Sequence, residues 1–172
     1  MYRFVQAVVF SLLSVVCAAV HAQPRPERVE VGGEARSFLW VGNSFFYYNN
    51  SMHGHVAALA RGMNPAVPLR GVSLTISGSG IDWHDIASYL KPDQIGRYSF
   101  VGDNEIVFNK PGRQFEGVIM MDCSQCPIHP QLKSVFTEYA KKQSQTVASY
   151  GARPIFFMSW AYKDKPEMTA QL

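Results

Sequence analysis

The sequence has few cysteines and little charge, and the charge is not clustered. Three of its 172 residues are cysteine, 17% are charged, and the net charge of +3 is not gathered into a basic run. Nucleic-acid binding requires a clustered basic surface, so the sequence argues against it. The histidines and cysteines also lack the spacing of metal ligands. We therefore expect no nucleic-acid partner, no metal and no cofactor.

The first 22 residues have the features of a cleavable signal peptide. Arg3 precedes an apolar stretch over residues 4–20, and the small residue Ala22 ends the segment. A membrane anchor is the alternative, but the apolar stretch is close to the minimum for a span and no basic stop-transfer cluster follows. We expect cleavage after Ala22, a secreted or periplasmic protein, and no stable membrane anchor.

Residues 23–36 are polar and contain two prolines and two glycines, which predicts a linker. Residues 37–172 then form a single candidate domain, since their number is typical of one domain. With 47% hydrophobic residues, the chain can build a packed core.

Strands and helices are expected to alternate along this domain. Short apolar runs predict strands over residues 37–41, 72–77, 117–121 and 154–160. Helical periodicity predicts helices over residues 51–61, 82–90 and 130–150. Residues 98–101 and 105–108 flank Gly102-Asp103-Asn104 and predict a hairpin. This order indicates an α/β fold with a doubly wound, mostly parallel sheet.

Ser44 stands where such a sheet places its ligands. The carboxyl ends of the strands carry the site, which brings together the loops over residues 42–46, 78–82, 122–127 and 160–164. Ser44 follows a buried strand and a glycine, and a hydrolase needs a nucleophilic hydroxyl beside backbone N–H groups that stabilise an oxyanion. The alternative is an ordinary polar turn that caps the next helix.

The segment Phe38-Leu-Trp-Val-Gly-Asn-Ser-Phe45 resembles the first block of the SGNH, or GDSL-like, hydrolase superfamily. The resemblance implies a flavodoxin-like α/β fold, with Ser44 as nucleophile and its N–H as one oxyanion donor. Residues 76–84 resemble the second block and imply a further donor, Gly78 or alternatively Gly80. His84 in this block also fits the resemblance, but a surface or packing histidine is the more ordinary interpretation.

Residues 117–127 resemble the third block, whose side chain donates to the oxyanion. Here the strand ends at Asp122, and an ionised carboxylate cannot donate a hydrogen bond. Gln125 or Ser124 would have to donate instead. Residues 151–162 resemble the late strand of the superfamily, and Trp160 is expected to line the pocket together with Asn43 and Asp122.

The resemblance extends over residues 38 to about 162, but one block is missing. The superfamily takes its base and orienting acid from a late Asp-x-x-His segment, and this sequence contains none. We therefore expect a C-terminally incomplete domain, inactive by itself because a serine without a base is a weak nucleophile.

The resemblance implies a serine esterase that acts on a small-molecule or carbohydrate ester outside the cytoplasm. Acetylated carbohydrate is one expected substrate class. The alternative is a non-catalytic exported ligand-binding domain, because a fold alone does not determine function. An Asp-x-x-His segment in the downstream sequence would favour the enzyme.

Cys123 and Cys126 remain after signal cleavage removes Cys17, and they could pair in an export compartment. A thiol oxidoreductase is a third hypothesis. Redox Cys-x-x-Cys pairs usually begin a helix, which lowers the thiol pKa, whereas Pro127 follows this pair and the next helix is expected only from residue 130. The spacing therefore favours a structural role.

Overall fold

The computed structural model describes residues 34–92, 94–95, 98–108 and 113–172. The expected signal peptide and most of the expected linker lie outside these residues. Within the described ranges, no helix combines the length and apolar character needed to cross a membrane. Residues 34–172 cluster into one structural unit, which carries all the elements below.

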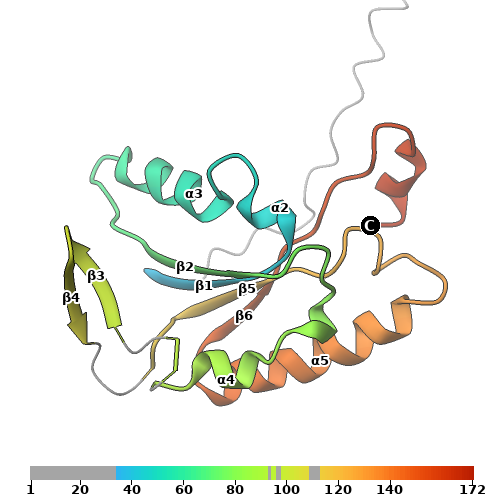
Figure 1. The fold of residues 1–172 in the computed structure, drawn as a ribbon. Coiled ribbons are helices and arrows are strands. Elements are labelled where there is room, and N and C mark those ends of the chain that lie inside the picture. Colours follow the sequence, from blue (N-terminus) through green and yellow to red (C-terminus); the bar gives the residue numbers. More distant parts are fainter. Residues whose placement is uncertain (1–33, 93, 96–97, 109–112) are drawn as a thin grey trace, which may run out of the picture. The chain divides into compact units, whose positions relative to one another are not determined.

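A four-stranded parallel sheet with the order β2-β1-β5-β6 lies at the centre of this unit (Figure 1). Its strands are β1 (Ser37–Gly42), β2 (Arg70–Thr75), β5 (Gly117–Met120) and β6 (Arg153–Phe156). Gly42 aligns with Thr75, and Val41 aligns with Met120. The carboxyl ends of β1, β2 and β5 therefore lie at one edge, as expected from the sequence.

Helices cover both faces of the sheet (Figure 1). On one face lie α2 (Ser44–Tyr47) and α3 (Met52–Arg61), and on the other α4 (Ile86–Leu90) and α5 (Lys133–Ser149). Successive side chains of a strand point to opposite faces, so Leu39 and Val41 enter one buried cluster and Trp40 enters the other. This arrangement confirms the doubly wound α/β fold.

One expected helix is divided into two elements, and one short helix was not expected. The helix expected over residues 82–90 is divided into a 3₁₀ turn, η1 (Ile81–Trp83), and α4. Asp85 causes the division, because its carboxylate accepts a hydrogen bond from the Ser88 amide at 3.2 Å and so starts a new helix. The short helix α2 was not expected; Asn43 caps it by accepting from the Phe45 amide.

The last elements are shorter than expected. Helix α5 begins at Lys133 rather than residue 130, because residues 130–132 still form a turn that follows the turn over residues 124–128. Strand β6 ends at Phe156 rather than residue 160, since its pairing with β5 ends where Phe156 aligns with Met120. A short 3₁₀ helix, η2 (Pro166–Ala170), follows.

The hairpin is confirmed. Strands β3 (Tyr98–Gly102) and β4 (Glu105–Phe108) pair antiparallel and form a separate two-stranded sheet. Asn104 in the turn has a φ of 59°, a left-handed conformation that asparagine tolerates better than most residues.

Candidate active site

Ser44 is the first residue of α2 and lies just beyond the carboxyl end of β1. The residue is half-buried. Among the described residues, none forms a hydrogen bond with the Ser44 hydroxyl, and none accepts one from the amides of Ser44, Gly78 or Gly80. A free hydroxyl and free backbone donors are the groups that acyl transfer requires.

Asn43 joins the first three loops. Its side-chain amide donates to the Ser79 carbonyl at 3.0 Å and to the Asp122 carbonyl at 3.2 Å. We expected Asn43 at the pocket wall, but it is only 3% exposed and packs between the loops. The predicted convergence of the Ser44, Gly78 and Asp122 segments is thus present, and a buried asparagine holds it together.

The two candidate glycines of the second loop differ in their exposure. Gly78 is exposed and has a φ of +72°, a left-handed conformation that favours glycine. Gly80 is buried, and a Cβ there would lie 2.5 Å from Asp82 Oδ1 and 2.9 Å from Asp122 Oδ1. Both positions therefore need glycine, one for its conformation and the other for space.

His84 is a buried positioning residue. Its Nε2 lies 3.0 Å from the Ser79 hydroxyl, which donates to the Gly42 carbonyl, and the Tyr89 hydroxyl lies 3.4 Å from Nδ1. Burial lowers the pKa of His84, which favours the neutral ring. A neutral ring with its proton on Nε2 satisfies both contacts. The packing interpretation is therefore correct, and sequence reasoning missed this link to Ser79.

Asp122 anchors the third loop. Its Oδ1 accepts hydrogen bonds from the Ile81 and Cys123 amides, both at 2.8 Å. Burial raises the pKa of Asp122, while the two amide bonds act in the opposite direction. Through Oδ1 the side chain ties the third loop to the second.

Of the two substitutes for this donor, only Gln125 has an unbonded side chain within the described ranges. The Ser124 hydroxyl is already bonded to the Tyr162 hydroxyl. Gln125 is half-buried, and its backbone carbonyl accepts from the His129 amide at 2.8 Å. In the described ranges its side-chain amide has no hydrogen-bond partner, so it is free to donate.

Cys123 and Cys126 form a disulfide with a Cα–Cα distance of 5.2 Å. The Cys126 amide also donates to the Cys123 carbonyl at 3.2 Å, so the bridge closes a tight turn. This turn lies before Lys133, the first residue of α5, and not in the first turn of that helix.

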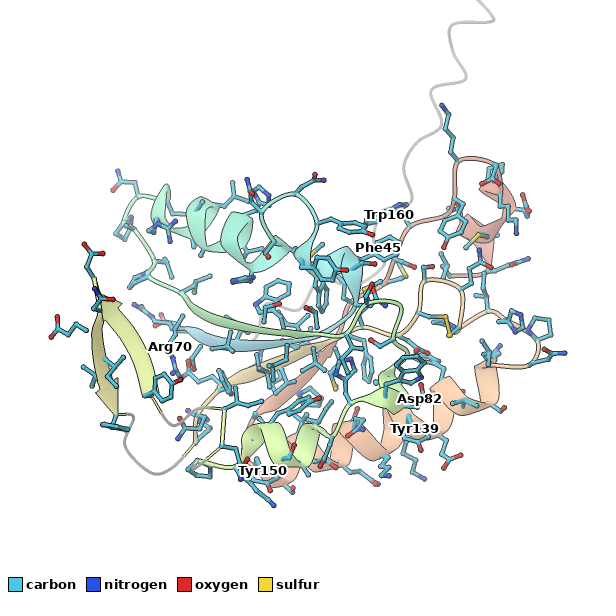
Figure 2. All side chains as sticks on the ribbon, in the orientation of Figure 1. Phe45, Arg70, Asp82, Tyr139, Tyr150 and Trp160 are labelled. Atoms are coloured by element: carbon cyan, nitrogen blue, oxygen red, sulfur yellow. A yellow bond between two sulfur atoms is a disulfide. The ribbon has the colours of Figure 1, made fainter. Side chains whose placement is uncertain are left out.

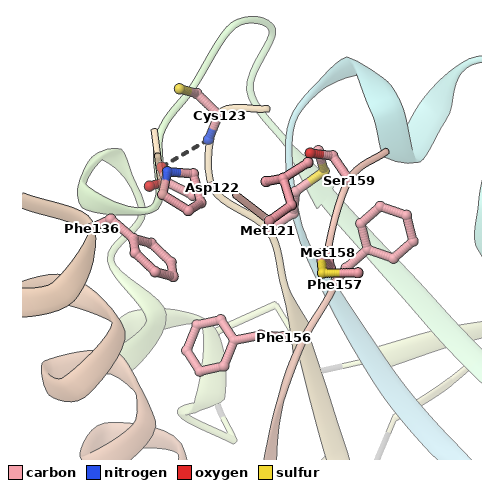
Figure 3. Close-up of a pocket in the computed structure, with 10 residues that line it drawn as sticks. Met121, Asp122, Cys123, Phe136, Phe156, Phe157, Met158 and Ser159 are labelled. Atoms are coloured by element: carbon pink, nitrogen blue, oxygen red, sulfur yellow. Dashed lines mark hydrogen bonds between the residues drawn. The ribbon is translucent and has the colours of Figure 1, made fainter. Parts of the chain in front are cut away.

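Two cavities flank the loops. The first lies between the loop after β5, the end of β6 and α5 (Figure 3), and its walls are Met121, Asp122, Cys123, Pro127, Phe136, Phe156, Phe157, Met158, Ser159 and Leu172. The second lies beside α2, with walls formed by Phe45, Tyr48, Asn49, Met52, His55 and Trp160. Asp122 lines the first cavity and Trp160 lines the second, so these two residues do not share one pocket as we expected.

No histidine of the described residues is arranged as a base for Ser44. His53 packs on Gly71 near the start of β2, and the His55 ring is bonded to the Asn49 carbonyl. His129 Nδ1 accepts from the Gln131 amide at 3.2 Å. Within the described ranges, none of these histidines pairs with a carboxylate.

No family model and no curated protein matches this sequence. A solved structure from Slackia heliotrinireducens, described as a putative SGNH hydrolase, matches the fold with a TM-score of 0.50 and 18% sequence identity. The match covers 76% of this chain and 59% of that one. The fold is SGNH hydrolase-like. The chain spans less than two thirds of the length of this neighbour, so the likeness concerns the fold and not an activity.

Proposed function

We propose that this chain carries the nucleophile and oxyanion loops of an SGNH-type serine esterase. The observation that supports this most is the pair of hydrogen bonds from Asn43, which hold the Ser44, Gly78 and Asp122 segments together. These bonds support the proposal because the Ser44 hydroxyl and the Gly78 and Gly80 amides, unbonded among the described residues, belong to loops that Asn43 joins. A turn that only caps a helix does not require hydrogen bonds to the second and third loops.

The chemistry is acyl transfer. The Ser44 oxygen attacks the ester carbonyl carbon while a base accepts the hydroxyl proton, and the carbonyl oxygen becomes an oxyanion. The Ser44 and Gly78 amides, or the Gly80 amide in place of Gly78, would stabilise that charge, with the Gln125 side chain as the third donor. The alcohol then leaves with the proton, and water releases the acyl group from Ser44.

The substrate we propose is an ester outside the cytoplasm, with acetylated carbohydrate as the class tested first. The catalytic base is proposed to come from sequence beyond these 172 residues, because no Asp-x-x-His segment is present and no described histidine is arranged for the task. By itself the chain should then be inactive, since triad members act as a unit.

The test compares three proteins with an aryl acetate: the 172-residue chain, its Ser44→Ala variant, and the chain extended through its natural downstream sequence. We expect Ser44-dependent turnover only from the extended chain. Turnover by the 172-residue chain that depends on Ser44 would show that a base such as His129 is already present. No Ser44-dependent turnover by a folded extended chain would overturn the esterase and favour the non-catalytic binding domain.

A further inference from the structure

The cavity beside α2 is lined by side chains that have no role in the attack of Ser44 on an ester. Its volume of about 320 Å³ is at the lower end of the range for small-molecule sites, roughly 300–1,000 Å³. We propose that this cavity binds a neutral pyranose ring, as a sugar subsite next to Ser44. The inference rests on the proposed function and adds to it the part of the substrate that is recognised.

The cavity is adjacent to Ser44 because α2 forms its wall. Tyr48 follows α2, and its amide donates to the Ser44 carbonyl at 3.0 Å. Phe45 comes directly after Ser44, and its ring lies 5.2 Å from that of Trp160 (Figure 2). Two residues of the cavity wall, Phe45 and Tyr48, therefore lie within four positions of the nucleophile along the chain.

The same wall continues to the second loop. The Tyr48 ring packs against the Tyr47 ring with centroids 5.2 Å apart, and the Tyr47 hydroxyl donates to the Ser77 hydroxyl at 3.1 Å. Ser77 precedes Gly78, the first candidate for the second oxyanion donor. The aromatic side chains thus connect the cavity to both proposed oxyanion loops.

The chemistry of the lining fits a sugar. Tyr48 is 61% exposed and Trp160 is 57% exposed, so both aromatic side chains are accessible to a ligand. The C–H groups of a pyranose carry partial positive charge and pack on the negative face of an aromatic ring. Among the described residues that line the cavity there is no aspartate, glutamate, lysine or arginine, which favours a neutral ligand.

Two polar residues can bind hydroxyl groups. His55 Nε2 donates to the Asn49 carbonyl, which leaves the other ring nitrogen, Nδ1, for a hydrogen bond with a ligand hydroxyl. The Asn49 side-chain amide is exposed and offers both a donor and an acceptor. An acyl chain would make no use of these groups, whereas a pyranose presents several hydroxyls to them.

The backbone at this wall is strained. Asn49, Asn50 and Ser51 have φ values of 52°, 66° and 67°, and none of them is glycine. Three consecutive left-handed residues cost free energy, and such strain concentrates at ligand clamps and active sites. The strained turn places Asn49 in the wall of the cavity, where the sugar would bind.

The test measures binding rather than turnover, so that it does not depend on a catalytic base. Xylohexaose, cellohexaose and chitohexaose, none of which carries an ester, are titrated into the 172-residue chain by isothermal titration calorimetry. At least one should bind in the millimolar range or tighter. Trp160→Ala and Tyr48→Ala should each weaken it about tenfold, which corresponds to about 1.4 kcal/mol, while Tyr48→Phe should retain most of the affinity.

Trp83→Ala is the matched control, because Trp83 is 61% exposed but does not line this cavity. Failure of all three sugars to bind the folded chain, or equal losses in Trp83→Ala and Trp160→Ala, would overturn the subsite. Binding of octanoate that Trp160→Ala abolishes, with no sugar binding, would identify an acyl site instead. Ser44→Ala should bind the sugar with unchanged affinity, because the test does not depend on turnover. If the esterase proposal alone is wrong, the sugar should still bind.

Discussion

At the scale of single residues, Asn43 contributes most to the assembly of the site. Asn43→Ala would leave the Ser79 and Asp122 carbonyls without their donor. We expect a loss of about 1–3 kcal/mol in the free energy of unfolding, measured in urea, because buried polar groups would be left unpaired. Gln145→Ala, at an exposed position in α5, should change it by less than about 0.5 kcal/mol. Equal stabilities would show that these bonds do not hold the loops.

Asp122 should make stability depend on pH. Burial raises its folded-state pKa above the unfolded value of about 3.9, so its contribution is fully present below that pH and is lost as pH rises through the folded pKa. Asp122→Asn keeps an oxygen for the Ile81 and Cys123 amides but cannot ionise. Its stability relative to the unmodified chain should therefore increase between about pH 4 and pH 7.

Urea unfolding at several pH values measures this difference, with the exposed Asp164→Asn as the control that should show no trend. The opposite trend would mean that the two amide bonds outweigh burial at Asp122, so that the ionised carboxylate stabilises the fold.

At the scale of elements, substitution by alanine should change the stability in opposite directions at two glycines. A Cβ at Gly117 in β5 would lie 2.8 Å from the Phe38 ring, so Gly117→Ala should destabilise by roughly 1–3 kcal/mol. Gly54 in α3 has no atom near its added Cβ, and Gly54→Ala should stabilise by roughly 0.5–1 kcal/mol. Thermal unfolding of both variants tests the pair; stabilisation by Gly117→Ala would contradict the close approach of β1 and β5.

The disulfide turn should stabilise the fold without redox catalysis. Because the bridge closes a loop of only four residues, its removal in a Cys123→Ser, Cys126→Ser double variant should cost at most about 2 kcal/mol. Urea unfolding measures that loss, and a dithiol–disulfide exchange assay should show no turnover by the unmodified chain. Turnover that disappears in Cys126→Ser would make the pair catalytic and this interpretation wrong.

At the scale of the whole molecule, the unit Glu34–Leu172 should depend on long-range hydrogen bonds made by one of its first residues. The Arg36 amide donates to Glu116 Oε2 at 2.5 Å, and the Arg36 carbonyl accepts from the Arg70 amide at 2.8 Å. A chain starting at Phe38 should therefore unfold at a lower temperature than one starting at Glu34. Equal melting temperatures of the two chains would show that Arg36 does not stabilise the sheet.

Much of this architecture could be predicted because it depends on local patterns. The apolar runs before Gly42 and Asp122 are buried strands, and Gly62 and Pro65 end α3 near the expected position. The end of strand β6 was wrong because it depends on a distant strand: β6 ends where its partner β5 ends. The start of α4 was wrong for a local reason, because Asp85 rather than Asp82 caps the helix.

The sequence by itself determined the α/β class, the order of the strands along the chain, and the place of Ser44 after β1, because side-chain periodicity and turn residues act over a few positions. The tertiary structure alone decided the partners of Asn43 and Asp122. Asn43 bonds residues 36 and 79 positions away, and Asp122 bonds Ile81 at a separation of 41. Such long-range hydrogen bonds form only when the sheet brings its strand ends to one edge, so local sequence patterns cannot predict them.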